Sequence, residues 1–190
     1  MKKLLLATLV CFFCITNVVA GNPVSVKSGQ ILALKTPSKA IMDVDYSATK
    51  VGKIPLDDYL QGRGTDFVRD WPQEAETAAS YFREQFNKKS KGMKLTTDET
   101  VASYKILIRV KTLDMGNAGS FFVSMALGGS KKAGGVIMNG TVEIIDLKTN
   151  QVVCLLYVDD VKGEGNPKDA IRMGMMYKEL AKKICKLKAK

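Results

Sequence analysis

Alternating apolar and polar positions identify the part of the chain on which the other elements depend. Between residues 134 and 162, two runs rich in β-branched residues alternate with a period of two, which is the pattern of β-strands. Residues 146–151 separate these runs, and Asn150 among them tolerates the positive φ that a tight turn requires. The pattern predicts a β-hairpin, and we expect the amphipathic segments elsewhere in the chain to pack on it.

The length of the hairpin loop decides which side chains share a face of the sheet. A three-residue loop at 148–150 pairs Ile144 with Cys154 and Val142 with Leu156. A loop of two or four residues would place Cys154 on the opposite face, because a slip of one residue inverts a strand. We predict the three-residue loop.

Two further segments have the period of amphipathic helices. The first, 72–89, follows Asp70 as a capping residue and has Pro72 at its first position. The second, 167–187, opens at Asn166 in the same order of cap and proline. Shorter apolar or alternating runs predict strands at 31–34, 40–46 and 104–111. Glycine and proline predict a surface segment at 49–65 with a helical turn at 56–61.

This order of elements predicts the fold class. We expect a single α+β domain over residues 21–190, with a mostly antiparallel sheet and two helices packed on one face. Residues 21–70 are expected to form an irregular N-terminal segment with a strand near 40–46.

Residues 114–135 interrupt the alternation with an apolar centre between glycines. The plainer interpretation is a long connection whose centre packs against the core. The alternative is a mobile loop that docks on a partner or on lipid.

The first twenty residues are predicted to lie outside the fold. Lys2 and Lys3 precede an apolar run, and small residues before Gly21 offer a cleavage site, which is the pattern of a secretory signal peptide. No segment after Ala20 is apolar for long enough to span a membrane. We expect cleavage near Ala20 and a periplasmic or secreted protein.

The basic balance of the chain does not by itself indicate a partner. The formal net charge of +10 falls to +8 once Lys2 and Lys3 are removed, and the excess is spread along the chain. Solubility explains such a distribution, so we predict no nucleic-acid partner. The lysines of the last helix leave peripheral contact with anionic lipid or a polyanion as the less favoured alternative.

The chemistry available for catalysis is narrow. The absence of histidine removes Ser-His and Cys-His nucleophile pairs and most zinc sites, and we expect no cofactor. Asp159, Asp160 and Glu164 are weak candidates for a calcium site or for acid–base catalysis. Only Cys154 and Cys185 follow the signal segment, and whether they form a disulfide stays open.

One apolar set has no predicted covering element. In the chosen register, five hairpin residues point away from the two helices: Ile137, Ile145, Val153, Leu155 and Tyr157. If residues 21–64 do not cover this patch, it has the character of a partner-binding surface. The sequence leaves both arrangements open.

Three segments carry a resemblance to a known family. The segment from Gly119 to Ser130, the run from Gly140 to Val153 and the closing helix resemble an uncharacterised family of small exported bacterial envelope proteins. Those proteins are similar in layout to the periplasmic domain of the curli-secretion channel family. The resemblance covers residues 71–186, but Asn150 stands where the family has glycine, and the lipid-anchoring cysteine is absent. It implies an envelope protein without catalytic residues.

These observations predict a non-enzymatic exported protein that binds or helps to assemble another envelope component, either a protein or a second copy of itself. The rival interpretation is a calcium-dependent binder or a carboxylate-based hydrolase that uses the three acidic residues named above.

Overall fold

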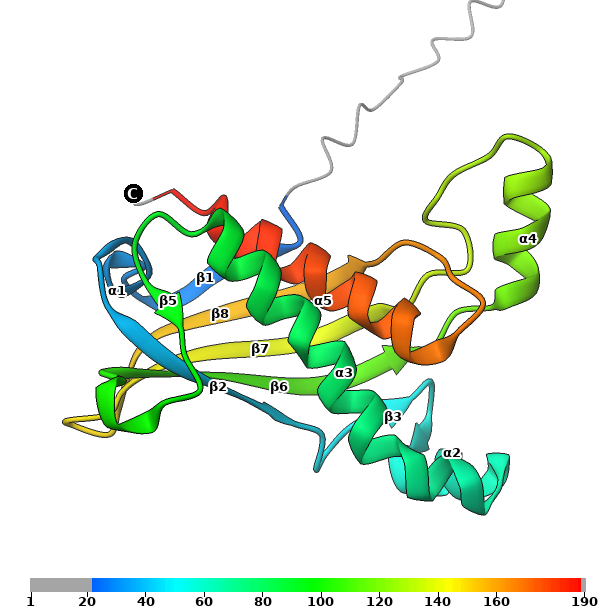
Figure 1. Ribbon diagram of the computed structural model, residues 1–190, viewed down its shortest axis with the longest axis horizontal. Coiled ribbons are helices and arrows are strands. Elements are labelled where there is room, and N and C mark those ends of the chain that lie inside the picture. The colour runs from blue at the N-terminus through cyan, green and yellow to red at the C-terminus, as the bar shows by residue number, and fades with distance from the viewer. Residues whose placement is uncertain (1–21, 189–190) are drawn as a thin grey trace, which may run out of the picture.

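A computed structural model describes residues 22–188, in which two long helices cover one face of a sheet (Figure 1). The signal peptide predicted at 1–20 lies outside the described residues. The first half of the chain contains β1 (Val24–Gly29), α1 (Leu32–Lys35), β2 (Lys39–Asp45), β3 (Lys50–Val51), β4 (Ile54–Pro55), α2 (Leu56–Arg63) and α3 (Thr65–Lys89). The second half contains β5 (Lys94–Leu95), the 3-10 helix η1 (Glu99–Val101), β6 (Tyr104–Asp114), α4 (Ala118–Ala126), β7 (Ile137–Asp146), β8 (Gln151–Lys162) and α5 (Asp169–Cys185).

The sheet has the strand order β1-β8-β7-β6-β2-β5, and β3 pairs with the far end of β6 and with β4. The α+β class is confirmed, but the expectation of a mostly antiparallel sheet with two helices is wrong. The described residues contain five α-helices, and β2 pairs in parallel with both β5 and β6, as β3 does with β6. The reason is that α3 connects β2 to β6, and a strand–helix–strand crossover returns the chain in the same direction.

The β7–β8 hairpin has the predicted register but not the predicted loop. Ile144 pairs with Cys154 and Val142 with Leu156, and Asn150 has a φ of 54°. The loop nevertheless has four residues, 147–150, because Asp146 pairs with Gln151. Val153 forms a bulge in β8 and adds one residue between Val152 and Cys154. The longer loop alone would have turned Cys154 to the opposite face, and the bulge returns it to the predicted face.

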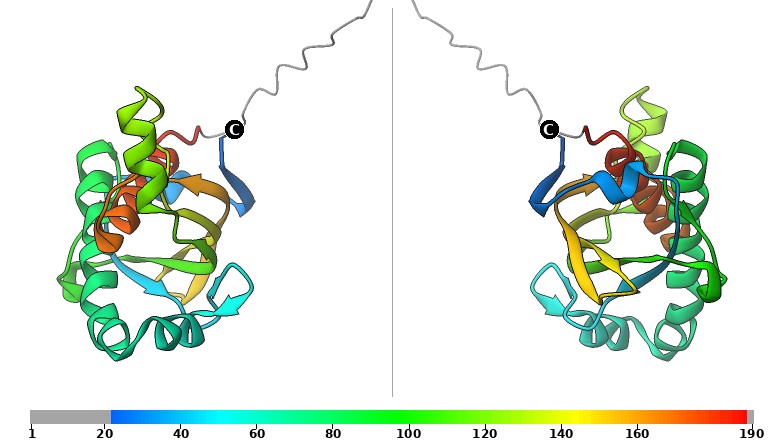
Figure 2. Two further views of the ribbon diagram at one scale, coloured as in Figure 1. Left: turned by 90° about the vertical axis from the view of Figure 1, so that its right-hand side faces the viewer. Right: turned by 90° about the vertical axis from the view of Figure 1, so that its left-hand side faces the viewer.

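Helices α3 and α5 lie side by side on one face of the sheet, as predicted (Figures 1 and 2). The core between the helices and the sheet is fully buried. The helices contribute Phe82, Phe86, Met173, Met176, Tyr177, Leu180 and Ile184, and the strands contribute Ile106, Ile108, Val142, Ile144, Cys154 and Leu156. Burial of this apolar surface is the main stabilising contribution to the fold.

The boundaries of several predicted elements are corrected. Helix α3 begins at Thr65, and Pro72 lies inside it on the exposed side, where water can satisfy the carbonyl group that proline leaves without a donor. Helix α5 begins at Asp169, two residues after the predicted start. Residues 31–34 fall mainly in α1 rather than in a strand, whereas the helical turn predicted at 56–61 is α2.

The centre of the 114–135 segment does not pack against the core. It forms α4, none of whose residues is buried, and it projects beyond the end of the sheet (Figure 1). Nor does any helix among residues 22–188 have both the length and the apolar character that crossing a membrane demands.

Candidate functional site

The face of the sheet opposite α3 and α5, here called the open face, contains most of the residues predicted to bind a partner. Its members follow from the strand register, since alternate side chains point to opposite faces. They are Asp43 and Asp45 on β2; Lys105, Leu107 and Arg109 on β6; Ile137, Asn139, Thr141, Glu143 and Ile145 on β7; and Val152, Leu155, Tyr157 and Asp159 on β8.

The N-terminal segment borders the open face instead of covering it. Strand β1 pairs along the edge of β8, and β2 forms part of the sheet itself. Figure 2 shows β1 and the β3–β4 hairpin at two rims of the open face, with the helices on the other side of the sheet. Tyr157 keeps 44% of its surface exposed, and Val152 keeps 50%. The question that the sequence left open is therefore answered for residues 22–64.

Four of the five predicted patch residues lie on the open face, and the fifth does not. Ile137, Ile145 and Leu155 are half-buried among neighbouring strands, and Tyr157 is exposed. Val153 is the extra residue of the β8 bulge and packs against the core cluster. Val152, which pairs with Ile145, takes its place. The sequence could not reveal this exchange, because the bulge leaves no mark in the alternation.

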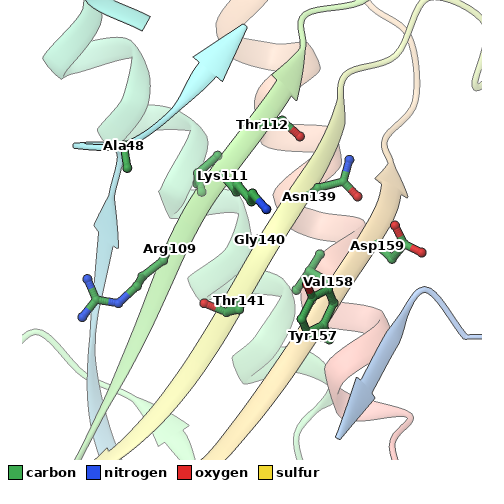
Figure 3. Close-up of a pocket in the computed structure, with 11 residues that line it drawn as sticks. Ala48, Arg109, Lys111, Thr112, Asn139, Gly140, Thr141, Tyr157, Val158 and Asp159 are labelled. Atoms are coloured by element: carbon green, nitrogen blue, oxygen red, sulfur yellow. The ribbon is translucent and has the colours of Figure 1, made fainter. Parts of the chain in front are cut away.

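A concavity of about 410 Å³ lies in the open face where β6, β7 and β8 cross its middle (Figure 3). Its lining comprises Ala48, Arg109, Val110, Lys111, Thr112, Asn139, Gly140, Thr141, Tyr157, Val158 and Asp159. The β6–β7 and β7–β8 pairings both shift in register at this level, with the extra residues on β6 and β8, which bends the sheet. Gly140 permits the bend, because a Cβ atom there would overlap with the carbonyl oxygen of Arg109.

Ion pairs cross the open face beside the concavity. The Arg109 guanidinium group contacts Asp45 at 2.6 Å and Glu143 at 2.8 Å, and Lys105 pairs with Asp43. Hydrogen bonds from Ser47, together with the charge of Arg109, lower the pKa of Asp45 below its ordinary value of 3.8. The hydrogen bond and charge of Glu143 raise the pKa of Arg109. Sequence reasoning missed Arg109, whose partners come from two other strands.

The three acidic candidates do not form a metal site. Asp159 lines the concavity, and Asp160 has a positive φ and exchanges two hydrogen bonds with Asn139, at 2.8 and 3.0 Å. Glu164 follows the end of β8 and is exposed. No group of three or more His, Cys, Asp or Glu side chains that could hold a metal ion occurs among residues 22–188. Asp160 therefore stabilises the second bulge of β8, opposite Asn139, which helps to shape the concavity.

Both cysteines in the described part of the chain are free thiols. Cys154 lies in the core beneath α5, on the face predicted for it, and Cys185 lies half-buried at the end of α5. Burial raises the pKa of the Cys154 thiol and raises that of Cys185 to about 11. Thiols with such pKa values are protonated at neutral pH and react slowly.

A second hollow, of about 670 Å³, lies between the outer edge of β2 and α3. Met42, Trp71 and Ala75 line its apolar part, and Arg83 and Glu76 form an ion pair at its rim. It contains none of the predicted partner-binding residues. The concavity of the open face does contain one, Tyr157, and is therefore the better candidate site.

The sequence matches no protein-family model and no curated protein. The solved structures similar to this chain include two PelC dodecamers from Paraburkholderia phytofirmans. One, in space group P6, is 14% identical, with a TM-score of 0.42 over 83% of this chain and 96% of that chain. The other, a single-substitution variant in space group C2, is 13% identical, with a TM-score of 0.40 over 83% and 95% of the two chains. Similarity at this level carries no information about function, and the resemblance to the curli-secretion channel family stays a prediction.

Proposed function

We propose that this chain is a non-enzymatic exported protein that binds a protein component of the cell envelope through its open face. The observation that carries the proposal is the concavity beside Tyr157, which residues 22–64 leave uncovered. Export is inferred from the signal-peptide pattern of residues 1–20.

The composition of the open face favours a protein partner over lipid or a polyanion. Four carboxylates, Asp43, Asp45, Glu143 and Asp159, lie on the same face as Lys105, Arg109 and Lys111, so a polyanion would meet repulsion as well as attraction. Insertion into lipid would remove these ion pairs from water at a large cost in free energy. An exposed tyrosine, an arginine and half-buried aliphatic residues with a charged rim are typical of protein interfaces.

The rival interpretation, a calcium-dependent binder or a carboxylate-based hydrolase, gains no support from the arrangement of its acidic residues. Asp160 is engaged with Asn139, and Glu164 lies beyond the strand. We therefore keep the non-enzymatic interpretation and do not propose the rival.

The test is site-specific crosslinking in the native envelope. A photo-reactive residue at Thr141, inside the concavity, is expected to crosslink to a defined protein partner, whereas the same residue at Val101, on η1, is not. Substituting both Leu155→Ser and Tyr157→Ser should abolish the crosslink because it removes the apolar part of the interface.

A matched control is the double variant Val68→Ser and Val101→Ser, whose side chains are as exposed as Tyr157 but lie elsewhere. The control should keep the crosslink, and both variants should remain folded at the temperature of the experiment, with the Leu155 and Tyr157 variant melting at most a few degrees lower. The proposal is wrong if the Thr141 crosslink is absent, or if it survives the loss of Leu155 and Tyr157.

A further inference from the structure

The segment from residue 117 to residue 134, here called the α4 arm, groups several of the exposed large apolar side chains found among residues 22–188. Four side chains of α4 and its C-terminal cap are at least half exposed: Phe122 at 57%, Val123 at 61%, Met125 at 51% and Leu127 at 81%. The helix contains no charged residue. Soluble proteins seldom expose apolar side chains in such a group unless the group contacts something.

The α4 arm has a defined structure with an anchored base. The Asn117 side chain caps α4 by accepting hydrogen bonds from the backbone N–H groups of Gly119, at 2.6 Å, and Ser120, at 3.3 Å. The Asn117 backbone N–H donates to the carbonyl oxygen of Gly134 at 3.2 Å, which closes the base of the arm. Gly134 has a φ of 67°, and a Cβ atom there would overlap with the Asn117 carbonyl, so only glycine fits.

Of the two aromatic residues in the arm, Phe121 turns inward and Phe122 turns outward. Phe121 is half-buried beside Gly165, where a Cβ atom would come within 2.7 Å of the Phe121 ring. The N–H of Gly165 also donates to the Lys131 carbonyl oxygen at 2.8 Å. These contacts hold the arm on the loop before α5, while Phe122 and Leu127 remain in solvent. The arm therefore presents its apolar side chains without first having to fold.

The charged residues within the α4 arm are all of one sign. Lys131 and Lys132 are exposed in the returning segment of the arm, and no acidic residue occurs between Asp114 and Glu143. Asp114 precedes the arm and Glu164 adjoins Gly165, so the acidic residues near the arm lie outside it. An apolar helix in an arm whose only charges are lysines matches the chemistry of an anionic bilayer surface, in which acyl chains lie beneath negatively charged headgroups. A protein interface would more often include tyrosine, tryptophan or arginine, and the arm has none of these.

We propose that the α4 arm inserts its apolar tip into the surface of an anionic membrane, with Lys131 and Lys132 at the headgroups. Insertion of this depth needs no membrane-spanning helix. It would attach the protein to a bilayer while the open face remains available. The inference uses no residue of the open face and stands independently of the function proposed above.

The test is co-sedimentation of the purified protein with vesicles at low salt. Vesicles of phosphatidylcholine with about 30% phosphatidylglycerol should bind the protein, and vesicles of phosphatidylcholine alone should bind it much less. The tip variant Phe122→Ser with Leu127→Ser should lower the partition coefficient by about 100-fold, because it removes two inserted apolar side chains. The charge variant Lys131→Gln with Lys132→Gln should lower it by about 30-fold, and added salt should reproduce that loss.

Two matched controls separate insertion from a general loss of apolar surface or charge. Leu32→Ser removes a side chain of similar exposure from α1, at the other end of the molecule, and Lys88→Gln with Lys89→Gln removes two lysines from α3. Neither control should change the partition coefficient. Because no residue of α4 is buried, the tip variant should have the same melting temperature as the unmodified protein.

Three results would overturn the inference: no binding to the anionic vesicles, equal binding by the tip variant and the Leu32 control, or equal binding to both kinds of vesicle. A fourth result would also overturn it: sedimentation velocity without vesicles could show an oligomer that the tip variant does not form. The tip would then contact a second copy of the chain instead of a membrane. The crosslinking result at Thr141 is unaffected by any of these outcomes.

Discussion

The two faces of the β7–β8 hairpin are built from the same two strands and have opposite surroundings. On the helix side, Val142, Ile144 and Leu156 are fully buried beneath α3 and α5. On the open side, their immediate neighbours Thr141 and Leu155 are only partly buried, and Tyr157 is exposed. A period of two therefore serves two purposes at once, since one set of positions stabilises the fold and the other is available for contact.

The largest expected effect compares adjacent residues of β8. Leu156→Ala should lower the free energy of unfolding by about 3 kcal/mol, because it leaves a cavity in the core. Leu155→Ala should lower it by less than about 1 kcal/mol, because part of its surface already meets water. Urea denaturation of the two variants measures the difference. Losses of similar size would mean that the open face is packed like the core, and the contrast between the faces would fail.

The next effect concerns the bend of the sheet at the level of the concavity. Gly140→Ala should cost about 2 kcal/mol, because its new methyl group would press on the Arg109 carbonyl and force β6 away from β7. Gly62→Ala is the matched control, since nothing lies near a Cβ atom at that helical position, and we expect it to be neutral or slightly stabilising. Thermal melting of both variants is the measurement. If Gly140→Ala is tolerated as well as Gly62→Ala, the close approach of β6 and β7 is not required.

The smallest effect concerns the ion pairs of the open face. The pKa of Asp45 is lowered in the folded protein, so the stabilisation that Asp45 provides is present above its ordinary pKa of 3.8 and is lost as the pH falls through the lower folded value. Arg109→Gln should remove part of this dependence, and the exposure of the pair limits the change to about 1 kcal/mol or less. The measurement is the free energy of unfolding between pH 6 and pH 3. If the free energy of unfolding depends on pH in the same way without Arg109, then Arg109 has no energetic coupling to Asp45. Ser47 would then be the main partner of Asp45.

Local patterns were sufficient to predict the hairpin, its pairing register and the common face of the two long helices. Each of these depends on residues close in sequence or on a strong apolar stripe. The parallel pairing of β2 with β6 was missed, although a strand, a helix and a strand in succession already indicated it. The early start of α3 was missed because Pro72 has the appearance of a first helical residue, and only tertiary packing shows that it lies within the helix.

The site was harder to predict than the fold. Val153 was assigned to the patch by simple alternation, and the bulge that moved it is a backbone event with no residue signature. Arg109 depends on two partners that lie 64 and 34 residues away in sequence, which no local pattern could connect. Helix α4 did carry a signal, since Asn117 is a good cap and Gly128 a good terminator. The phenylalanine and valine residues between them are weak helix formers and obscured it.

The four-residue loop and the β8 bulge together suggest where the protein will accept foreign sequence. The bulge already offsets the fourth loop residue, and the Asp146–Gln151 pair closes the loop, so residues inserted at 147–150 would extend from the tip and leave the paired strands in register. A small epitope tag or a dye-binding insertion placed there would follow the hairpin outward, well removed from the α4 arm at the far end of the sheet (Figure 1). That position offers a way to label the protein for imaging while both proposed contact surfaces remain intact.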